Sequence, residues 1–122
     1  MINLIYIYFL ISILFNQERG WTHPETGWEV ISGTHMAIYM VSNIYIDNQE
    51  AEDNHSDAIG VFFENQCIGW DYYNSGLTII PTIGNDGNNP NFPIDGSLVS
   101  LYIYDDSEDV ILELQSLEEI PL

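Results

Sequence analysis

The chain has 122 residues, with 19 acidic side chains and one basic side chain, and its formal net charge at pH 7 is −18. Such a surface repels the phosphates of nucleic acids and anionic lipid headgroups, so neither is expected as a partner. A hydrophobic content of 46% is sufficient for the core of one globular domain. An acidic surface of this kind suits a soluble extracellular protein, or one neutralised by divalent cations.

Residues 4–15, from Leu4 to Phe15, are apolar apart from Ser12. They are fewer than the roughly 20 residues that cross a membrane, but they suit the core of a secretory signal peptide. We therefore predict a signal peptide over residues 1–17 and a single mature domain over residues 18–122, extracellular and without stable membrane insertion. The alternative is a retained β-strand that completes the sheet of a neighbouring subunit, since Ile, Tyr and Phe favour strands.

Two strands are predicted in the first part of the mature domain. Pro24 marks a turn with Gly27, after which residues 27–31 begin a strand. Residues 34–46 form a longer strand whose first half is apolar on both faces, as in the core of a sandwich. Residues 47–57 carry five acids and two asparagines, which predict a solvated loop.

The centre of the chain predicts a β-meander, in which three successive strands pair within one sheet. The strands are Ala58–Phe63, residues 67–73 and residues 77–83, and the turns are residues 64–66 and 74–76. The turn residues tolerate positive φ, and the flanking segments are rich in β-branched and aromatic residues. This meander is the expected centre of the core.

The last part of the chain predicts a long loop and two strands. Residues 84–96 are rich in Asn, Asp, Gly and Pro, which excludes a helix or a central strand. Residues 97–105 and 110–114 return to the strand pattern. Strands at about ten-residue spacing, without a convincing amphipathic helix, predict an all-β fold. We expect an antiparallel β-sandwich, Ig-like or Greek-key-like, with about seven strands and no substantial helix.

Calcium is the ion that the acidic loops suit, because it prefers carboxylate and amide oxygens. Asn85, Asp86 and Asp95 are the first candidate ligands, since their glycine-rich loop is able to wrap an ion. The spaced EF-hand pattern is absent, and solvated turns are the alternative, so no cofactor is predicted as required. Asn54 begins an Asn-x-Ser triplet and is the candidate for N-glycosylation.

The sequence predicts no enzymatic activity. The three histidines lack the spacing of a zinc site, and no nucleophile elbow or phosphate loop is present. No pair among the many acids is marked for glycoside hydrolysis. Cys67 lies within an apolar strand, where a free cysteine is typically a small buried hydrophobe.

The aromatic residues offer a candidate binding surface. Trp70 and Tyr72 share one face of their strand by the two-residue repeat. With Trp21, Trp28 and Tyr73 they are candidates for a platform on which carbohydrate rings stack. Packing within the core is the alternative for the same aromatic residues.

Six short segments follow one another in a recognisable order. They are Thr34-His35, Asp57 to Phe63, Cys67 to Trp70, Gly84-Asn85-Asp86, Asp95-Gly96 and Leu101 to Asp105. Their order resembles a β-sandwich module of secreted, multi-module surface proteins of Bacteroidota-like bacteria, and the match covers residues 28–105. The resemblance implies an extracellular, non-enzymatic structural or adhesive module. The chain departs from it at Ser56 and Ser97, where the module has Gly and Glu.

Together these features predict a secreted structural or adhesive subunit that associates with itself. Sheet edges pair with other chains unless they are blocked, commonly by lysine, and this chain has no lysine. Strand exchange through residues 4–15 or 109–115 builds a filament, because a head-to-tail contact does not close on itself. The alternative is a carbohydrate-binding module that uses Trp70 and Tyr72 on a polysaccharide.

Overall fold

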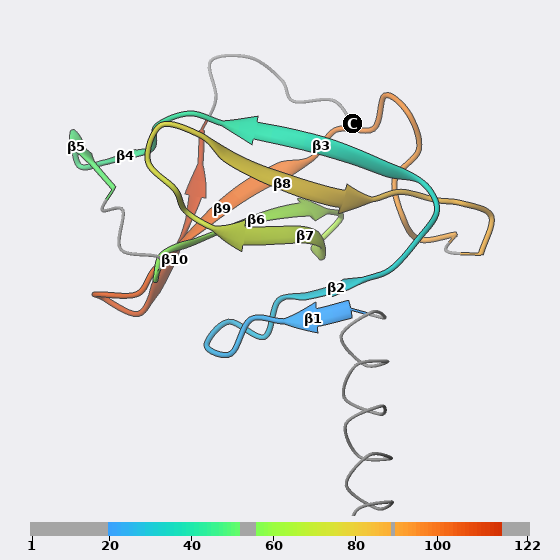
Figure 1. Cartoon of the computed structure of the whole chain (residues 1–122), viewed down its shortest axis with the longest axis horizontal. Helices are drawn as coiled ribbons and strands as arrows, with labels where there is room; N and C mark the ends of the chain where they lie inside the picture. Colours follow the sequence, from blue (N-terminus) through green and yellow to red (C-terminus); the bar gives the residue numbers. More distant parts are fainter. Residues whose placement is uncertain (1–19, 52–55, 89, 116–122) are drawn as a thin grey trace, which may run out of the picture.

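The computed structural model describes residues 20–51, 56–88 and 90–115, which form antiparallel strands and loops (Figure 1). The strands are β1 (Gly20–Thr22), β2 (Glu29–Ile31), β3 (Met36–Val41), β4 (Tyr45–Ile46), β5 (Gln49–Glu50), β6 (Ala58–Phe63), β7 (Gln66–Tyr72), β8 (Thr78–Ile83), β9 (Ser100–Asp105) and β10 (Val110–Leu114). The predicted all-β antiparallel sandwich is confirmed. None of the described residues belongs to a helix long and apolar enough to span a membrane. The predicted signal peptide and Asn54 lie outside the described residues.

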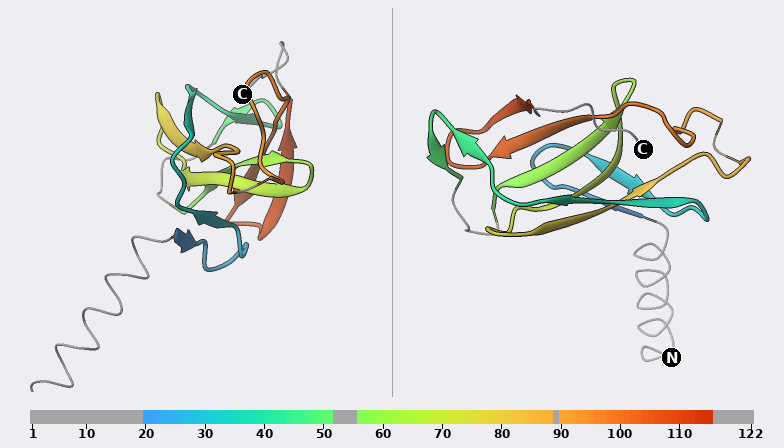
Figure 2. Two further views of the ribbon diagram at one scale, coloured as in Figure 1. Left: turned by 90° about the vertical axis from the view of Figure 1, so that its right-hand side faces the viewer. Right: turned by 90° about the horizontal axis from the view of Figure 1, so that it is seen from above.

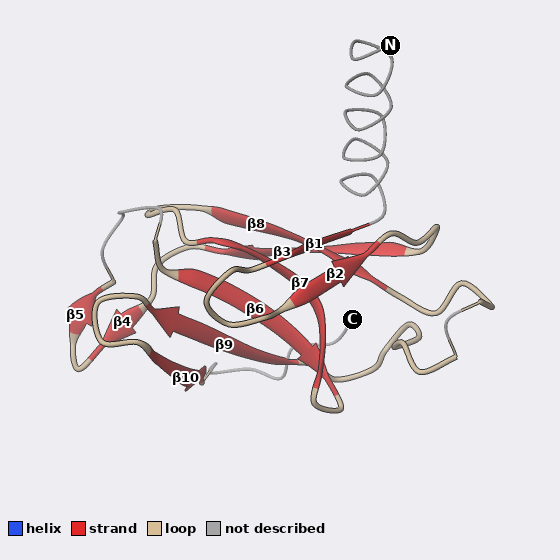
Figure 3. Ribbon diagram, turned by 90° about the horizontal axis from the view of Figure 1, so that it is seen from below, coloured by secondary structure: helices blue, strands red, loops and turns tan. Residues whose placement is uncertain are grey.

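The strands are stacked in three layers (Figure 2). The middle layer is a four-stranded sheet in the order β10-β9-β6-β7. A ribbon of β3 and β8 covers one of its faces, and the hairpin of β1 and β2 covers the opposite face (Figure 1). The small hairpin of β4 and β5 lies at one end (Figure 3).

The main core lies between the middle sheet and the β3–β8 ribbon. Alternate residues of a strand share a face, so Ile59 and Val61 of β6 point to this side together with Leu101 and Ile103 of β9. Ile80 of β8 packs against them from the ribbon, and all five side chains are buried. Their burial stabilises the fold by about 25 cal/mol for each Å² of apolar surface removed from water.

The two layers of the main core lie very close to each other at Gly69 of β7. A Cβ atom at this position would lie 2.3 Å from the backbone oxygen of Pro81 and 2.9 Å from the Cγ2 atom of Thr82, both on β8. Only glycine leaves room for this approach. Beside it, a β-bulge between Val61 and Phe62 shifts the pairing of β6 with β7.

The predicted meander is wrong in the pairing of its third strand. β6 and β7 form the expected hairpin, with Glu64 and Asn65 at positive φ in its turn. β8 forms where it was predicted, but it pairs with β3 in the other layer. Because β7 packs face to face on β8 at Gly69, this close approach takes the place of a hydrogen-bonded ladder between them.

Two further predictions need correction. The strand predicted over residues 34–46 is interrupted, since β3 ends at Val41 and β4 begins at Tyr45. The predicted loop of residues 47–57 contains β5, which pairs with β4. Asp57 is buried instead of solvated, because its Oδ1 atom accepts a hydrogen bond of 2.9 Å from the backbone N–H of Asp106.

Candidate functional site

The face of the middle sheet that points away from the main core is lined with aromatic rings. In β6 and its neighbours, Gly60 is opposite both Trp70 and Tyr102, and Ala58 is opposite both Tyr72 and Tyr104. Residues directly opposite each other in a sheet share a face. We call this surface the aromatic face; its sheet residues are Phe62, Trp70, Tyr72, Tyr102 and Tyr104.

The β1–β2 hairpin is seated on the aromatic face by Trp28. A Cβ atom at Gly60 would lie 3.0 Å from the Trp28 ring and 2.8 Å from the Cε1 atom of Phe62. Glycine at position 60 therefore makes the hollow in which these two rings meet edge to face, with centroids 5.6 Å apart. The hairpin itself is closed by the N–H of His23, which donates to the carbonyl of Trp28 at 2.8 Å.

Trp21, at the start of the same hairpin, stacks on Trp70. Their ring centroids are 4.2 Å apart and their planes differ by 22°. Trp70 is 2% exposed, whereas Trp21 is 45% exposed. The ring that meets solvent on this part of the aromatic face is therefore Trp21.

The two predicted stacking residues are brought together on one face, as the two-residue repeat indicated. Trp70 and Tyr72 lie edge to face with centroids 5.1 Å apart. Trp70 is enclosed by the β1–β2 hairpin and Tyr72 is half-buried, so Trp70 presents no open ring to a sugar. Tyr73 is fully buried in the main core.

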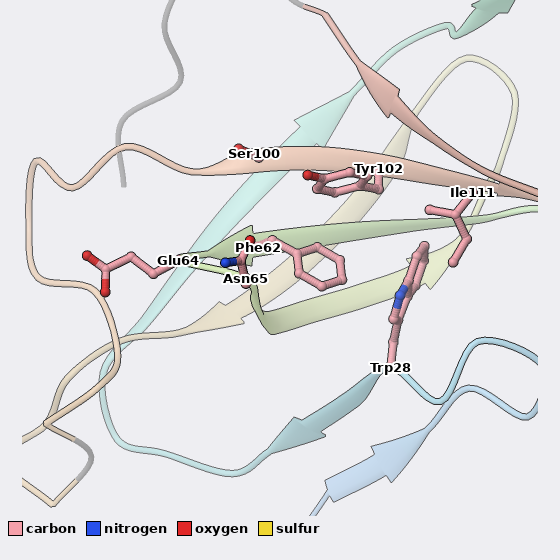
Figure 4. Close-up of a pocket in the computed structure, with 7 residues that line it drawn as sticks. All are labelled: Trp28, Phe62, Glu64, Asn65, Ser100, Tyr102 and Ile111. Atoms are coloured by element: carbon pink, nitrogen blue, oxygen red, sulfur yellow. The ribbon is translucent and has the colours of Figure 1, made fainter.

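A hollow of about 340 Å³ opens on the aromatic face (Figure 4). Trp28, Phe62 and Tyr102 form aromatic walls, and Asn65 of the β6–β7 turn lies at the border beside Phe62, while the Glu64 side chain points away from the rings. Aromatic walls with a few polar groups are the chemistry of a small-ligand site. Because the walls come from separate strands, no local sequence pattern indicates this hollow. The Glu64-Asn65 pair by itself indicates only a turn.

His23 is buried under the hairpin among aromatic rings. Its centroid lies 4.8 Å from Trp70, 5.4 Å from Tyr104 and 5.5 Å from Tyr72. Its Nδ1 atom accepts hydrogen bonds from the backbone N–H groups of Thr26, at 3.1 Å, and Glu25, at 3.3 Å. The neutral imidazole therefore carries its proton on Nε2.

Acid should destabilise the fold through His23. Burial lowers the pKa of His23 below its ordinary value of 6.5, although nearby Glu25 and Asp106 act in the opposite direction. Below pH 6.5 the unfolded chain takes up a proton that the folded chain resists, so the contribution of His23 to stability is present above that pH. It is lost as the pH falls from 6.5 toward the lowered pKa.

Urea unfolding of the parent chain and of the His23→Gln variant, at about pH 7.5 and about pH 5, measures this loss. The parent should lose more unfolding free energy on acidification than the variant does. The carboxylates titrate alike in both chains, so the difference isolates the imidazole. Equal losses in the two chains would contradict the assignment.

Asp86, one of the three candidate calcium ligands, is held by hydrogen bonds within the protein. Asp86 accepts hydrogen bonds through Oδ2 from the Thr34 backbone N–H and hydroxyl, and through Oδ1 from the Asn88 N–H. Asn85 and Asp95 both line another hollow, of about 360 Å³. Within the described ranges no group of three or more acids, histidines or cysteines is placed to hold a metal ion. Calcium binding at these residues stays a prediction.

Cys67 lies in an apolar strand as predicted, but it is half-buried and not fully buried. Its thiol donates a weak hydrogen bond to the carbonyl of Gly69 at 3.4 Å. Burial raises the pKa of Cys67 to about 11. The thiol is therefore protonated at neutral pH, which makes it a poor nucleophile.

Comparison with known proteins adds no family to this geometry. No family model, curated protein or solved structure matches the chain. The resemblance to a bacterial surface module therefore stays a prediction from the residues that carry it.

Proposed function

We propose that this protein is a secreted, non-enzymatic structural or adhesive subunit that assembles into a filament through the outer edge of β10. The surrounding acids give the subunit a soluble surface. The proposal needs one open sheet edge and one strand that fits it.

The exposed, apolar edge strand β10 is the observation that supports this function. β10 is an edge strand and, among the described residues, it pairs only with β9. Val110, Ile111 and Leu112 are exposed on it, so the strand is apolar on both faces, a combination that monomeric proteins avoid at a sheet edge. The opposite edge strand, β7, packs against β2 and β8. β10 is thus the edge that suits pairing with another chain.

β10 suits the accepting role because its own turn holds it in place. The Oδ1 atom of Asp105 accepts hydrogen bonds from the Ser107 hydroxyl, at 2.7 Å, and from its N–H, at 3.1 Å. The Tyr104 hydroxyl donates to Asp109 at 2.8 Å. These bonds cost free energy to break if β10 leaves its sheet, so an added strand is favoured over a donated β10.

Residues 4–15 are the proposed donor in the neighbouring subunit. Their Ile, Tyr and Phe content suits a strand that is apolar on both faces. Pairing of this segment with β10 of another copy is a head-to-tail contact, which does not close and therefore gives a filament. The donor role requires that the segment is kept after secretion.

Electron microscopy of the full chain tests the proposal. We expect filaments from the parent protein and at least about tenfold fewer from the Ile111→Glu variant. The added carboxylate on the edge strand meets an acidic incoming copy, and charges on edge strands oppose pairing. A parent protein that forms no filaments under any assembly condition would contradict the proposal.

Ile94 supplies the matched control for this experiment. It is 65% exposed, against 50% for Ile111, and it precedes a turn outside the strands. Ile94→Glu should assemble like the parent. An equal loss of filaments in both variants would assign the effect to added charge and not to the β10 edge.

A carbohydrate-binding module is the second candidate function, and the hollow on the aromatic face favours it. Trp28, Phe62 and Tyr102 offer ring surfaces, with the amide of Asn65 at the border of the hollow. If a polysaccharide binds there, intrinsic tryptophan fluorescence should change when soluble polysaccharides are added. An unchanged spectrum across a panel of polysaccharides removes this candidate.

A further inference from the structure

The outer face of the β3–β8 ribbon is apolar throughout. Strand alternation turns Tyr39 of β3 and Ile80 of β8 toward the core, so their neighbours point outward. The outward residues are Met36, Ile38 and Met40 of β3, Ile79 and Pro81 of β8, and Leu77 just before β8. We call this surface the ribbon face. Ile38 is opposite Pro81 and Met40 is opposite Ile79, so the residues form one continuous patch.

The ribbon face is large for a monomeric protein. Its five Met, Ile and Leu residues are between 46% and 71% exposed. At about 200 Å² for each fully exposed residue, they present on the order of 600 Å², the upper end for a single apolar patch on a monomer. Two such faces in contact would bury about 1,200 Å² in total, the area at which specific protein interfaces begin.

The distribution of charged residues indicates which kind of partner the ribbon face suits. The chain carries 19 acids, yet neither β3 nor β8 contains a charged residue. A basic partner would be drawn to the acidic loops, and an anionic membrane would be repelled by the net charge. Two copies of this chain repel each other elsewhere, so an uncharged face is where they are able to approach.

We infer that the ribbon face is an interface at which two copies of this chain pack face to face around a two-fold axis. The contact is isologous, with the same patch on both copies. Apolar sheet faces pack about 10 Å apart, and the flexible side chains of Met36 and Met40 adapt to fill the seam. This interface is separate from the β10 edge and does not require filament formation.

Sedimentation velocity of the full chain, across a hundredfold range of concentration, tests the interface. In the fraction that stays soluble after filaments are pelleted, we expect a reversible dimer for the parent. The dissociation constant should be at least about tenfold higher for Ile38→Glu, because a carboxylate would be buried without a partner. The matched control is Leu98→Glu, since Leu98 is 56% exposed against 62% for Ile38 and lies outside the ribbon face. The control should dimerise like the parent.

Two additional measurements separate this interface from folding defects and from filaments. Met40→Glu repeats the test at the most exposed position of the face, and the thermal melt of each variant reports whether it folds. The Ile111→Glu variant should still dimerise, since β10 lies in the other layer. In the parent, oxidation of Met40 by peroxide should slow as the protein concentration rises.

The inference is overturned if the parent is monomeric at every concentration, or if folded Ile38→Glu and Met40→Glu dimerise as tightly as Leu98→Glu. Loss of the dimer in Ile111→Glu would move the interface to the β10 edge. Oxidation of Met40 that is independent of concentration would equally place the contact elsewhere.

Discussion

Gly69→Ala should melt about 15 °C below the parent chain, which corresponds to a loss of about 3 kcal/mol for a domain of this size. The added Cβ atom would stand 2.3 Å from the carbonyl oxygen of Pro81. Since that oxygen belongs to the backbone of β8, it is unable to turn aside as a side chain does. The two layers must separate, and the main core on either side loses contact. Differential scanning calorimetry measures the change.

Two other glycines provide the comparison for Gly69. At Gly60 the three atoms nearest to an added Cβ belong to the side chains of Trp28 and Phe62, so Gly60→Ala should cost about 1–2 kcal/mol. At Gly87 no atom lies within 4 Å, but φ is +96°, so Gly87→Ala reports backbone strain alone, about 1 kcal/mol. If Gly69→Ala proves no more harmful than Gly87→Ala, the layers are not as tightly apposed as described.

The second large effect is expected at the stacked tryptophans. Trp70→Ala should reduce the free energy of unfolding by about 3–5 kcal/mol, because it leaves a cavity beneath the hairpin. Trp21→Ala removes the half-exposed member of the same stacked pair and should cost about 1 kcal/mol. Urea unfolding followed by circular dichroism compares them, since fluorescence itself changes when a tryptophan is removed.

The difference in unfolding free energy between Trp70→Ala and Trp21→Ala shows whether Trp70 is needed for the stability of the fold. A large loss for Trp70→Ala and a small one for Trp21→Ala agree with Trp70 as part of the packed interior. If both variants are equally stable, Trp70 is dispensable to the fold. A ligand-stacking role for Trp70 would then regain its support.

The strands of this fold could be read from the sequence because their signals are local. Ala58–Phe63 and Val110–Leu114 were placed with their observed bounds, since a hydrophobic run and a polar turn define each end. The same local signals located β8 but said nothing about its partner. Which strand lies beside β8 depends on the close contact of Gly69 with Pro81, which no short-range pattern records.

The candidate site was less predictable, because it too depends on contacts between segments that are distant in the sequence. The two-residue repeat correctly placed Trp70 and Tyr72 on one face. What covers that face, however, comes from the β1–β2 hairpin, far away in the sequence. Asp57 illustrates the limit further: it belongs to an acidic run, yet it is buried because it accepts a hydrogen bond from the backbone of Asp106.

The pairing of the strands ties the layers into one cooperative unit. β3 pairs with β8, and β6 pairs with β9. Since β6 lies between β3 and β8 along the chain while β9 follows both, the two ladders interlock. Any cut of the chain between β3 and β9 therefore separates at least one of these strands from its partner. Neither the middle sheet nor the β3–β8 ribbon is a contiguous stretch of chain that could fold on its own. A substitution that disturbs a close contact such as the one at Gly69 therefore weakens the whole domain, which unfolds as a unit.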